Sequence, residues 1–354
     1  MNGRNHRRVD LRNAAVVGAA WAAALLIVAA LLEPKAAAAG WLVGFAFWAQ
    51  MLVGSLTLIM IHRLTGGRWG ELAAPVIEPA AAAVPLLLLL TVPLFISIPT
   101  LYPWPHHPAA IKPDVLSYYL HVPSFIVRTT LALIGWSALA FFLPRISGRS
   151  GRFLAAHGLV FHALVISFVS IDWYLSLEAP FTSSSFGASV AISSLVGALA
   201  FIALLAPMPD GDPSVGDIGG LLLATVLGIT YIDFMAVLVI WYGDLPHEEN
   251  WFVERDRWPW DALAATAFIL ASVVPVLALL LARVRNARRP LRAVGACVLI
   301  GLACYDAYLI APAADWQALI TALVAVIGIG LALLGLFVSG VTTLFPARES
   351  ADVR

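Results

Sequence analysis

Long apolar runs, separated by short polar segments, dominate the chain. Runs of about 20 residues recur ten times, and a helix of that length crosses about 30 Å of hydrocarbon. The runs are continuous rather than alternating, which predicts helices and not the strands of a barrel. We therefore expect an all-α polytopic membrane bundle that forms a single integral membrane domain over residues 1–354. The expected spans are 13–32, 40–61, 75–99, 120–143, 153–175, 184–206, 218–241, 261–283, 290–311 and 316–344.

Composition agrees with a lipid-embedded chain. The 354 residues are 61% hydrophobic and only 12% charged, against about 25% charged in soluble domains. The bilayer is therefore the first expected partner. A net charge of zero argues against a nucleic-acid partner. The basic segment 1–17 leads into the first apolar run, and no convincing cleavage site precedes a soluble domain, so we expect a retained first span.

The distribution of basic residues predicts the orientation. Sixteen of the 21 lysines and arginines lie at one set of span ends, namely the two termini and the connections near 63–68, 145–152 and 283–292. Four lie at the alternate ends, and Arg128 lies inside a span. By the positive-inside rule, both termini are expected in the cytoplasm. An even number of spans agrees with this.

The two longest connections, 100–117 and 242–260, then fall on the outer face. Both are rich in tryptophan, proline and charge. Two interpretations remain open: anchoring of the aromatic rings in the headgroup zone, and binding of an outer-face partner. The candidate partner-binding residues are Trp104, Trp251, Trp258 and Trp260.

Ionisable residues inside the spans are the candidate functional groups, because each costs a few kcal/mol in the membrane and needs a partner or a task. Those expected near the cytoplasmic side are Glu78, His157 and His162. Those expected toward the outer side are Arg128, Asp172, Asp233 and Asp306, with Glu178 just beyond a span. Their depths predict a salt bridge from Arg128 to Asp172 or Asp233. We expect Asp233 to share a polar interior with Arg128, either in a fixed pair or as a neutral proton carrier.

Simpler roles are open for several of these residues. Glu78 can be a favourable acid in a first helical turn or a step of a proton path. His157 and His162 are five residues apart and do not share a helix face well, so we expect no metal or haem pair. Asp172 and Glu178 end a helix where the macrodipole disfavours acids. That position suggests an external partner or a solvated polar pocket.

No enzyme or redox template is present in the sequence. It has no Walker, GxSxG or HExxH motif. It also lacks CxxC and CxxCH, so we expect no catalytic residue, no metal and no redox cofactor bound by this chain. Cys297 and Cys304 lie seven residues apart in one apolar run. We interpret them as small packing residues.

Four stretches carry a family resemblance. They are 61–81 (IHRLTGGRWGELAAPVIEPAA), 120–143, 172–187 (DWYLSLEAPFTSSSFG) and 238–255 (LVIWYGDLPHEENWFVER). Together they resemble the F subunit of bacterial alternative complex III, a relative of the NrfD/polysulfide-reductase membrane subunits. The resemblance implies two four-helix bundles, made by spans 2–5 and 6–9, with spans 1 and 10 as extra helices.

The resemblance also implies a function. Complexes of this kind lie in the bacterial cytoplasmic membrane, oxidise quinol and pass electrons through iron–sulfur and haem c subunits. The F subunit binds no cofactor, lies beside an NrfD-like membrane subunit and has been proposed to conduct protons. This chain departs from the family in span 7, where Gly219 and Gly220 replace a lysine and Met235–Ala236 replaces a Ser–Gln pair. Asp233 is new nearby, so a proton path through this span is either absent or rerouted.

Two other functions remain open. The chain can be an NrfD-like anchor that binds quinone beside a partner's iron–sulfur cluster. It can instead be a stand-alone secondary transporter, for which the proline-interrupted stretch 79–96 is typical.

Overall fold

The computed structural model describes residues 2–106, 113–178, 181–209 and 211–338, with the side chains of all of these except 2–8 and 247. All regular secondary structure of these residues is helical, and the described part contains no strand. Among the described residues nine helices are long and apolar enough to cross a membrane, and a tenth span results if one bent pair is counted. The expected all-α polytopic bundle is confirmed, and the chain is a multi-pass membrane protein.

The helices follow the apolar runs closely. Proline in the first turn starts several of them, where its missing N–H costs nothing, and side chains cap two: His121 accepts from the Ser124 N–H, and Asp212 from the Ser214 N–H. The helices are α1 (Asn2–Leu32), α2 (Pro34–Thr65), α3 (Trp69–Ala82), α4 (Leu86–Leu90), α5 (Val92–Leu101), α6 (Pro113–Tyr118), α7 (Val122–Phe142), α8 (Gly148–Trp173), α9 (Phe186–Leu205), α10 (Pro213–Tyr242), α11 (Pro246–Val253), α12 (Trp260–Phe268), α13 (Val274–Leu280), α14 (Ala282–Arg285), α15 (Arg288–Ile310) and α16 (Gln317–Val338). Shorter turns are η2 (Leu143–Arg145), η3 (Leu175–Glu178), the π-turn η4 (Ile269–Val273) and η5 (Ala311–Ala313).

The expected span 75–99 is not one straight helix. It is broken into α3, α4 and α5, and the two halves are bent by 47°. Pro85 and Pro93 follow the two breaks, and proline removes a backbone donor and clashes with the preceding turn. The end of the expected span 316–344 (339–344) and the connection residues 107–112 and 179–180 lie outside the described residues.

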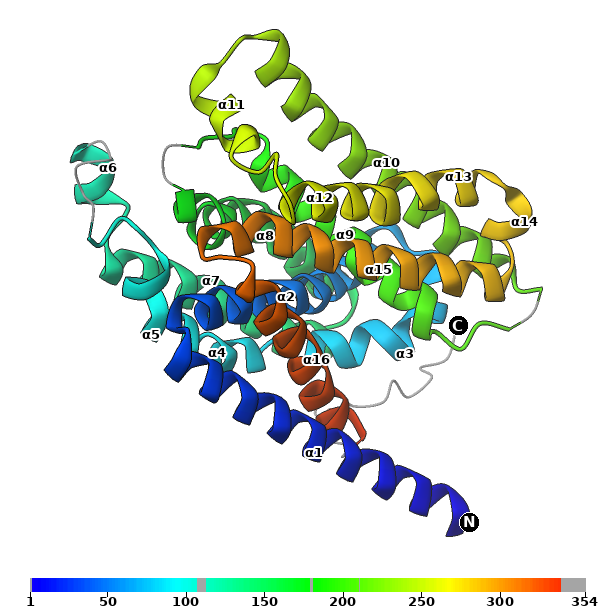
Figure 1. Cartoon of the computed structure of the whole chain (residues 1–354). Coiled ribbons are helices and arrows are strands. Elements are labelled where there is room, and N and C mark those ends of the chain that lie inside the picture. Colours follow the sequence, from blue (N-terminus) through cyan, green and yellow to red (C-terminus); the bar gives the residue numbers. More distant parts are fainter. Residues whose placement is uncertain (1, 107–112, 179–180, 210, 339–354) are drawn as a thin grey trace.

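The helices pack as two groups around α2 (Figure 1). One group joins α2 to α3, α5 and α8, and α8 to α7. The other joins α9 to α10 and α15, and α15 to α12. Helix α2 also packs on α9 and so connects the groups, while α1 lies outermost against α16 and α2. Helix α2 packs more extensively on α16 and α9 than on α3, α5 or α8, so the division into spans 2–5 and 6–9 stays a prediction.

Helix α2 is central because its small residues let other backbones approach closely. Of the 18 most apolar consecutive residues of α2, 89% are buried inside the bundle. A Cβ added at Gly54 would lie 2.0 Å from the Ser194 carbonyl oxygen on α9, and one at Gly40 would lie 2.1 Å from Thr321 Oγ1 on α16. Glycine at these two positions therefore permits the contacts of α2 with α9 and α16.

The bundle has two polar ends. Arg63 donates to the Ile146 carbonyl over 2.6 Å and Arg68 lies 3.7 Å from Asp212, which brings together the connections near 66–68, 143–147 and 206–212. We name this end, with the connection 281–287, the arginine face. The opposite end carries η3, α11, η5 and the chain near 102–106 and 113–121, and we name it the tryptophan face.

Candidate functional site

Arg128 on α7 and Asp172 on α8 form a closed ion pair, one of the two pairings expected from depth. The guanidinium is bidentate, with Nη2–Oδ1 at 2.7 Å and Nε–Oδ2 at 2.9 Å. It also donates to the Tyr119 carbonyl at 2.9 Å and to Ser124 Oγ, and its Cζ lies 3.7 Å from the Tyr119 ring centre. Because all these partners satisfy both charges, the pair serves to hold α7, α8 and the segment before α7 together.

Asp233 does not share this site, and the expectation that it faces the same interior as Arg128 is wrong. Its Oδ1 accepts from Ser189 Oγ on α9 at 2.7 Å, and Tyr305 on α15 also hydrogen-bonds to it. Helices α8 and α9 lie between α7 and α10. Arg128 and Asp233 therefore lie on different sides of the bundle, although the sequence predicts a similar depth for both.

Asp306 is a deeply buried carboxyl, and in contrast to Asp172 its hydrogen-bonding partners are neutral. It is 2% exposed, and its Oδ1 accepts from Gln50 Nε2 at 2.8 Å and from the Tyr174 hydroxyl at 3.3 Å. Gln50 Nε2 also donates to Tyr174 at 3.0 Å. Asp306 Oδ2 has no hydrogen-bond partner within the described chain. Burying a carboxyl in the membrane without a cation costs free energy, which makes Asp306 a candidate functional residue.

These groups form two hydrogen-bonded clusters that meet at α15. Tyr305 and Asp306 are neighbours on α15, and their side chains reach α10 and α2 respectively. We name the set the interior polar array. Its members are Gln50, Tyr174, Ser189, Asp233, Tyr305 and Asp306.

A second ion pair closes the tryptophan face. Arg255, just after α11, lies 2.5 Å from Glu178 Oε1, and its Cζ is 3.7 Å from the Trp251 ring centre. Its Nη1 donates to the Trp251 carbonyl at 3.0 Å, and the Trp251 ring meets the Tyr308 ring at 5.6 Å. Glu178, an acid that the sequence predicts at an unfavourable helix end, is thus paired with Arg255 from the connection 242–260.

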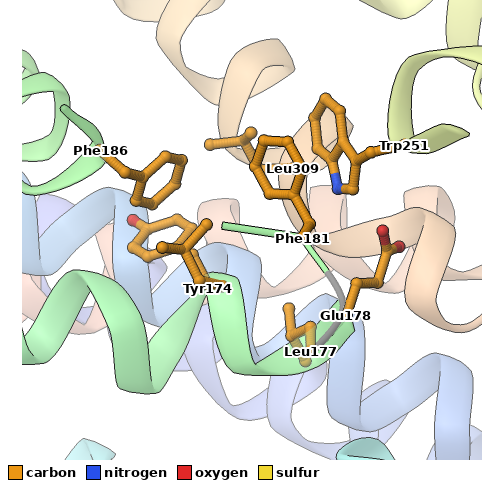
Figure 2. Close-up of a pocket in the computed structure, with 8 residues that line it drawn as sticks. Tyr174, Leu177, Glu178, Phe181, Phe186, Trp251 and Leu309 are labelled. Atoms are coloured by element: carbon orange, nitrogen blue, oxygen red, sulfur yellow. The ribbon is translucent and has the colours of Figure 1, made fainter. Parts of the chain in front are cut away.

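A pocket lies between this ion pair and the interior polar array (Figure 2). The empty space among its lining atoms is about 260 Å³ including open solvent, of which about 10 Å³ can hold a water molecule. The rings of Phe181 and Trp251 stack with centroids 4.7 Å apart on one side, and Tyr174 meets Phe186 at 5.8 Å on the other. The lining residues are Tyr174, Leu175, Leu177, Glu178, Phe181, Phe186, Trp251 and Leu309. Tyr174 belongs to both the pocket and the array, so the array reaches the tryptophan face through its ring.

The remaining candidates lie elsewhere. His162 is buried against Trp136, with ring centroids 5.8 Å apart, whereas His157 is exposed and its Nδ1 lies 2.9 Å from the Phe153 carbonyl. The two histidines face different sides, as their spacing predicts. Glu78 is half-buried in α3 between two prolines. Across the described chain no three His, Cys, Asp or Glu side chains are grouped to hold a metal ion.

The four tryptophans differ sharply in exposure. Trp104 and Trp260 are 2% and 4% exposed, and Trp251 is half-buried in the pocket wall. Trp258 alone of the four projects freely, at 81%. Trp104 and Trp260 therefore pack within the bundle and leave little surface for a partner. Partner binding through Trp258 stays a prediction.

Sequence reasoning missed Gln50, Tyr174 and Arg255. Gln50 is the single amide in the apolar run 40–61, which is a signal that could have found it. Tyr174 and Arg255 lie in the two stretches that carry the family resemblance at 172–187 and 238–255, and the structure brings these stretches together at the pocket. No protein-family model matches the chain, and no curated protein matches it at a significant level.

Proposed function

We propose that the chain is a cofactor-free membrane subunit of a quinol-oxidising respiratory complex of the alternative complex III type. In this proposal it lies in the bacterial cytoplasmic membrane, with iron–sulfur, haem c and NrfD-like subunits as partners. One observation carries the proposal. The two resembling stretches, far apart in sequence, build a single site in which Glu178 pairs with Arg255 and Tyr174 connects the pocket to Asp306.

The chemistry of the interior polar array supports a role in proton movement. Carboxyl, phenol and hydroxyl groups can each accept and donate a hydrogen bond. Asp306 and Asp233 are hydrogen-bonded by neutral groups only, and uncompensated intramembrane acids commonly mark proton relays. Asp233 takes the place of the polar groups that span 7 lacks relative to the family. We propose that the array passes protons toward the tryptophan face.

A quinone-binding anchor is the second candidate, favoured by the aromatic lining of the pocket. Ligand pockets are commonly about 300–1,000 Å³, whereas the space in this pocket that can hold a water molecule is about 10 Å³. The size favours a passage for protons or water over a site for a quinone ring. Quinone extracted in equal amount with the purified chain would favour the second candidate instead.

The assignment is tested by purifying the chain from native membranes with an affinity tag. We expect a multihaem cytochrome c, an iron–sulfur subunit and an NrfD-like subunit to copurify. A chain that purifies alone and transports a solute in vesicles would overturn the proposal in favour of the transporter alternative.

Replacing Asp306 with asparagine tests the proton role. Asparagine keeps the size and hydrogen-bonding oxygen of the side chain but cannot carry the proton, so we expect normal assembly and electron transfer with fewer protons moved per electron. The measurement is proton release per electron in reconstituted vesicles. Asp256→Asn, an exposed acid of the tryptophan face, is the control and should leave the yield unchanged. An unchanged yield in Asp306→Asn would remove that residue from any proton path.

The predicted topology has its own test. The bias of basic residues toward the arginine face leads us to expect both termini in the cytoplasm. A C-terminal fusion should therefore be active with a reporter that works in the cytoplasm and inactive with one that works only in the periplasm. The opposite result would invert the orientation and place the pocket on the cytoplasmic side.

A further inference from the structure

The connection between α13 and α15 is the most basic segment of the described chain. We name residues 281–292 the arginine hairpin. It carries five arginines in ten positions, which are Arg283, Arg285, Arg288, Arg289 and Arg292. Within the described residues none of the five forms an ion pair, since the three pairs present use Arg68, Arg128 and Arg255. The hairpin therefore keeps its positive charge.

The nearest element does not neutralise it. The start of α10 packs on the hairpin, so that a Cβ added at Gly216 would lie 2.6 Å from Asn286 Oδ1. Asp212, which caps α10, is committed elsewhere. Hydrogen bonds from Ser214, first from its backbone N–H and then from its side chain, hold the pKa of Asp212 below its usual range, and Arg68 lies 3.7 Å away. Asp217 is exposed to solvent.

Arg292 has an unmet donor. Its Nη2 donates to the Ala206 carbonyl at 3.1 Å, which fixes the guanidinium against the end of α9. Its Nε is buried and finds no acceptor within the described chain. A buried donor left without an acceptor costs about 1–3 kcal/mol, so an acceptor oxygen supplied from outside the chain would stabilise this position.

The backbone favours an anion at the same place. Ala287 stands at the N-cap of the 23-residue helix α15 and offers no side-chain acceptor to the free N–H groups of the first turn. A helix start attracts negative charge. Arginine forks match phosphate oxygens in pairs. Because the hairpin joins two apolar spans, it lies at the level of lipid headgroups, where basic segments meet anionic lipid.

We propose that the arginine hairpin binds the phosphate of an anionic phospholipid, with Arg289 and Arg292 as its main contacts. The site is independent of the proposed respiratory function, since it uses none of the pocket or array residues. It differs from the general attraction that sets membrane orientation because it requires guanidinium geometry at one place. Arg149 and Arg152, two exposed arginines of the same face at the start of α8, provide a charge-matched comparison.

The test measures lipid retained by the purified full-length chain after equilibration with phosphatidylglycerol or phosphatidylcholine at high ionic strength, by native mass spectrometry. We expect wild type and Arg149→Gln/Arg152→Gln to retain phosphatidylglycerol equally and in preference to phosphatidylcholine. Arg289→Gln/Arg292→Gln should bind it about tenfold more weakly, the effect of one lost charge-assisted hydrogen bond. Equal loss in both double variants, or equal retention in all proteins, would overturn the proposal.

A charge-preserving variant covers the case in which the glutamine variant does not fold. Arg289→Lys/Arg292→Lys keeps the charge that orients the chain but removes the planar forks. We expect it to fold and still to retain less phosphatidylglycerol than wild type. Retention equal to wild type would reduce the site to unspecific charge. Inorganic phosphate displacing the lipid at millimolar concentration would assign the site to a free anion and overturn the lipid assignment.

Discussion

Replacing Arg128 with alanine is expected to destabilise the protein more than replacing Arg128 and Asp172 together. Asp172 is 1% exposed in its side chain and its bidentate cation is Arg128. Removing the arginine leaves a buried carboxylate without a cation, whereas removing both leaves an apolar gap. Breaking a buried pair in this way costs about 3–5 kcal/mol, while joint replacement is often close to neutral.

The measurement is a double-mutant cycle of unfolding free energy in a detergent and denaturant mixture, with Arg128→Ala, Asp172→Ala and the double variant. Arg149→Ala, at an exposed position of α8, should change the unfolding free energy little. A double variant destabilised by the sum of the two single losses would show that the residues do not act as a pair. The structural role assigned to the pair would then fail.

The apolar runs predicted the helices well because hydrocarbon leaves a spanning segment few alternatives. The run 75–99 was the exception. Its length predicted one straight span, although the prolines that interrupt 79–96 are visible in the sequence and lie at both breaks between α3, α4 and α5. Hydrophobicity reports the medium that surrounds a segment, and it does not report where the helix axis changes direction.

Depth along the membrane predicted the pairing of Arg128 only in part. The sequence predicts similar depths for Asp172 and Asp233. Which of them pairs with Arg128 depends on which helices are neighbours, and a single sequence does not contain that information. The contact of α7 with α8 decides it. Depth gives only the position along the membrane normal. It therefore reduces the number of possible partners of a buried charge but does not identify the partner.

Uncharged and loop residues were the main omissions. Gln50 and Tyr174 escaped because the search considered charged side chains, although both hold Asp306. For the tryptophans, the polar composition of the connections predicts segments that lie free of the bundle. Trp260 instead starts α12 and is buried in the core. Whether a loop folds back depends on tertiary contacts that composition does not show.

Replacing Arg255 with alanine is expected to release α11 from the bundle and to prevent assembly with partner subunits. Arg255 is 3% exposed and holds Glu178 at 2.5 Å while its guanidinium covers the Trp251 ring. Losing a charge-assisted hydrogen bond and a cation–π contact together costs about 3 kcal/mol of stabilising free energy. The loss falls on the connection 242–260, which is otherwise held near α11 by the Trp251 ring contacts and the hydrogen bond from Thr182 to Glu248, so we expect local release rather than global unfolding.

Limited proteolysis of the purified chain measures this release, and copurification from native membranes measures assembly. Arg257→Ala, an exposed arginine two residues away, is the matched control and should cut and assemble as wild type does. Cleavage near 242–260 that rises in Arg255→Ala alone would support the ion pair as the closure of the tryptophan face. If Arg255→Ala resists protease as wild type does, the pair does not hold α11. If α11 is released yet every partner still copurifies, the partners bind elsewhere. The prediction that Trp258 binds a partner would then fail.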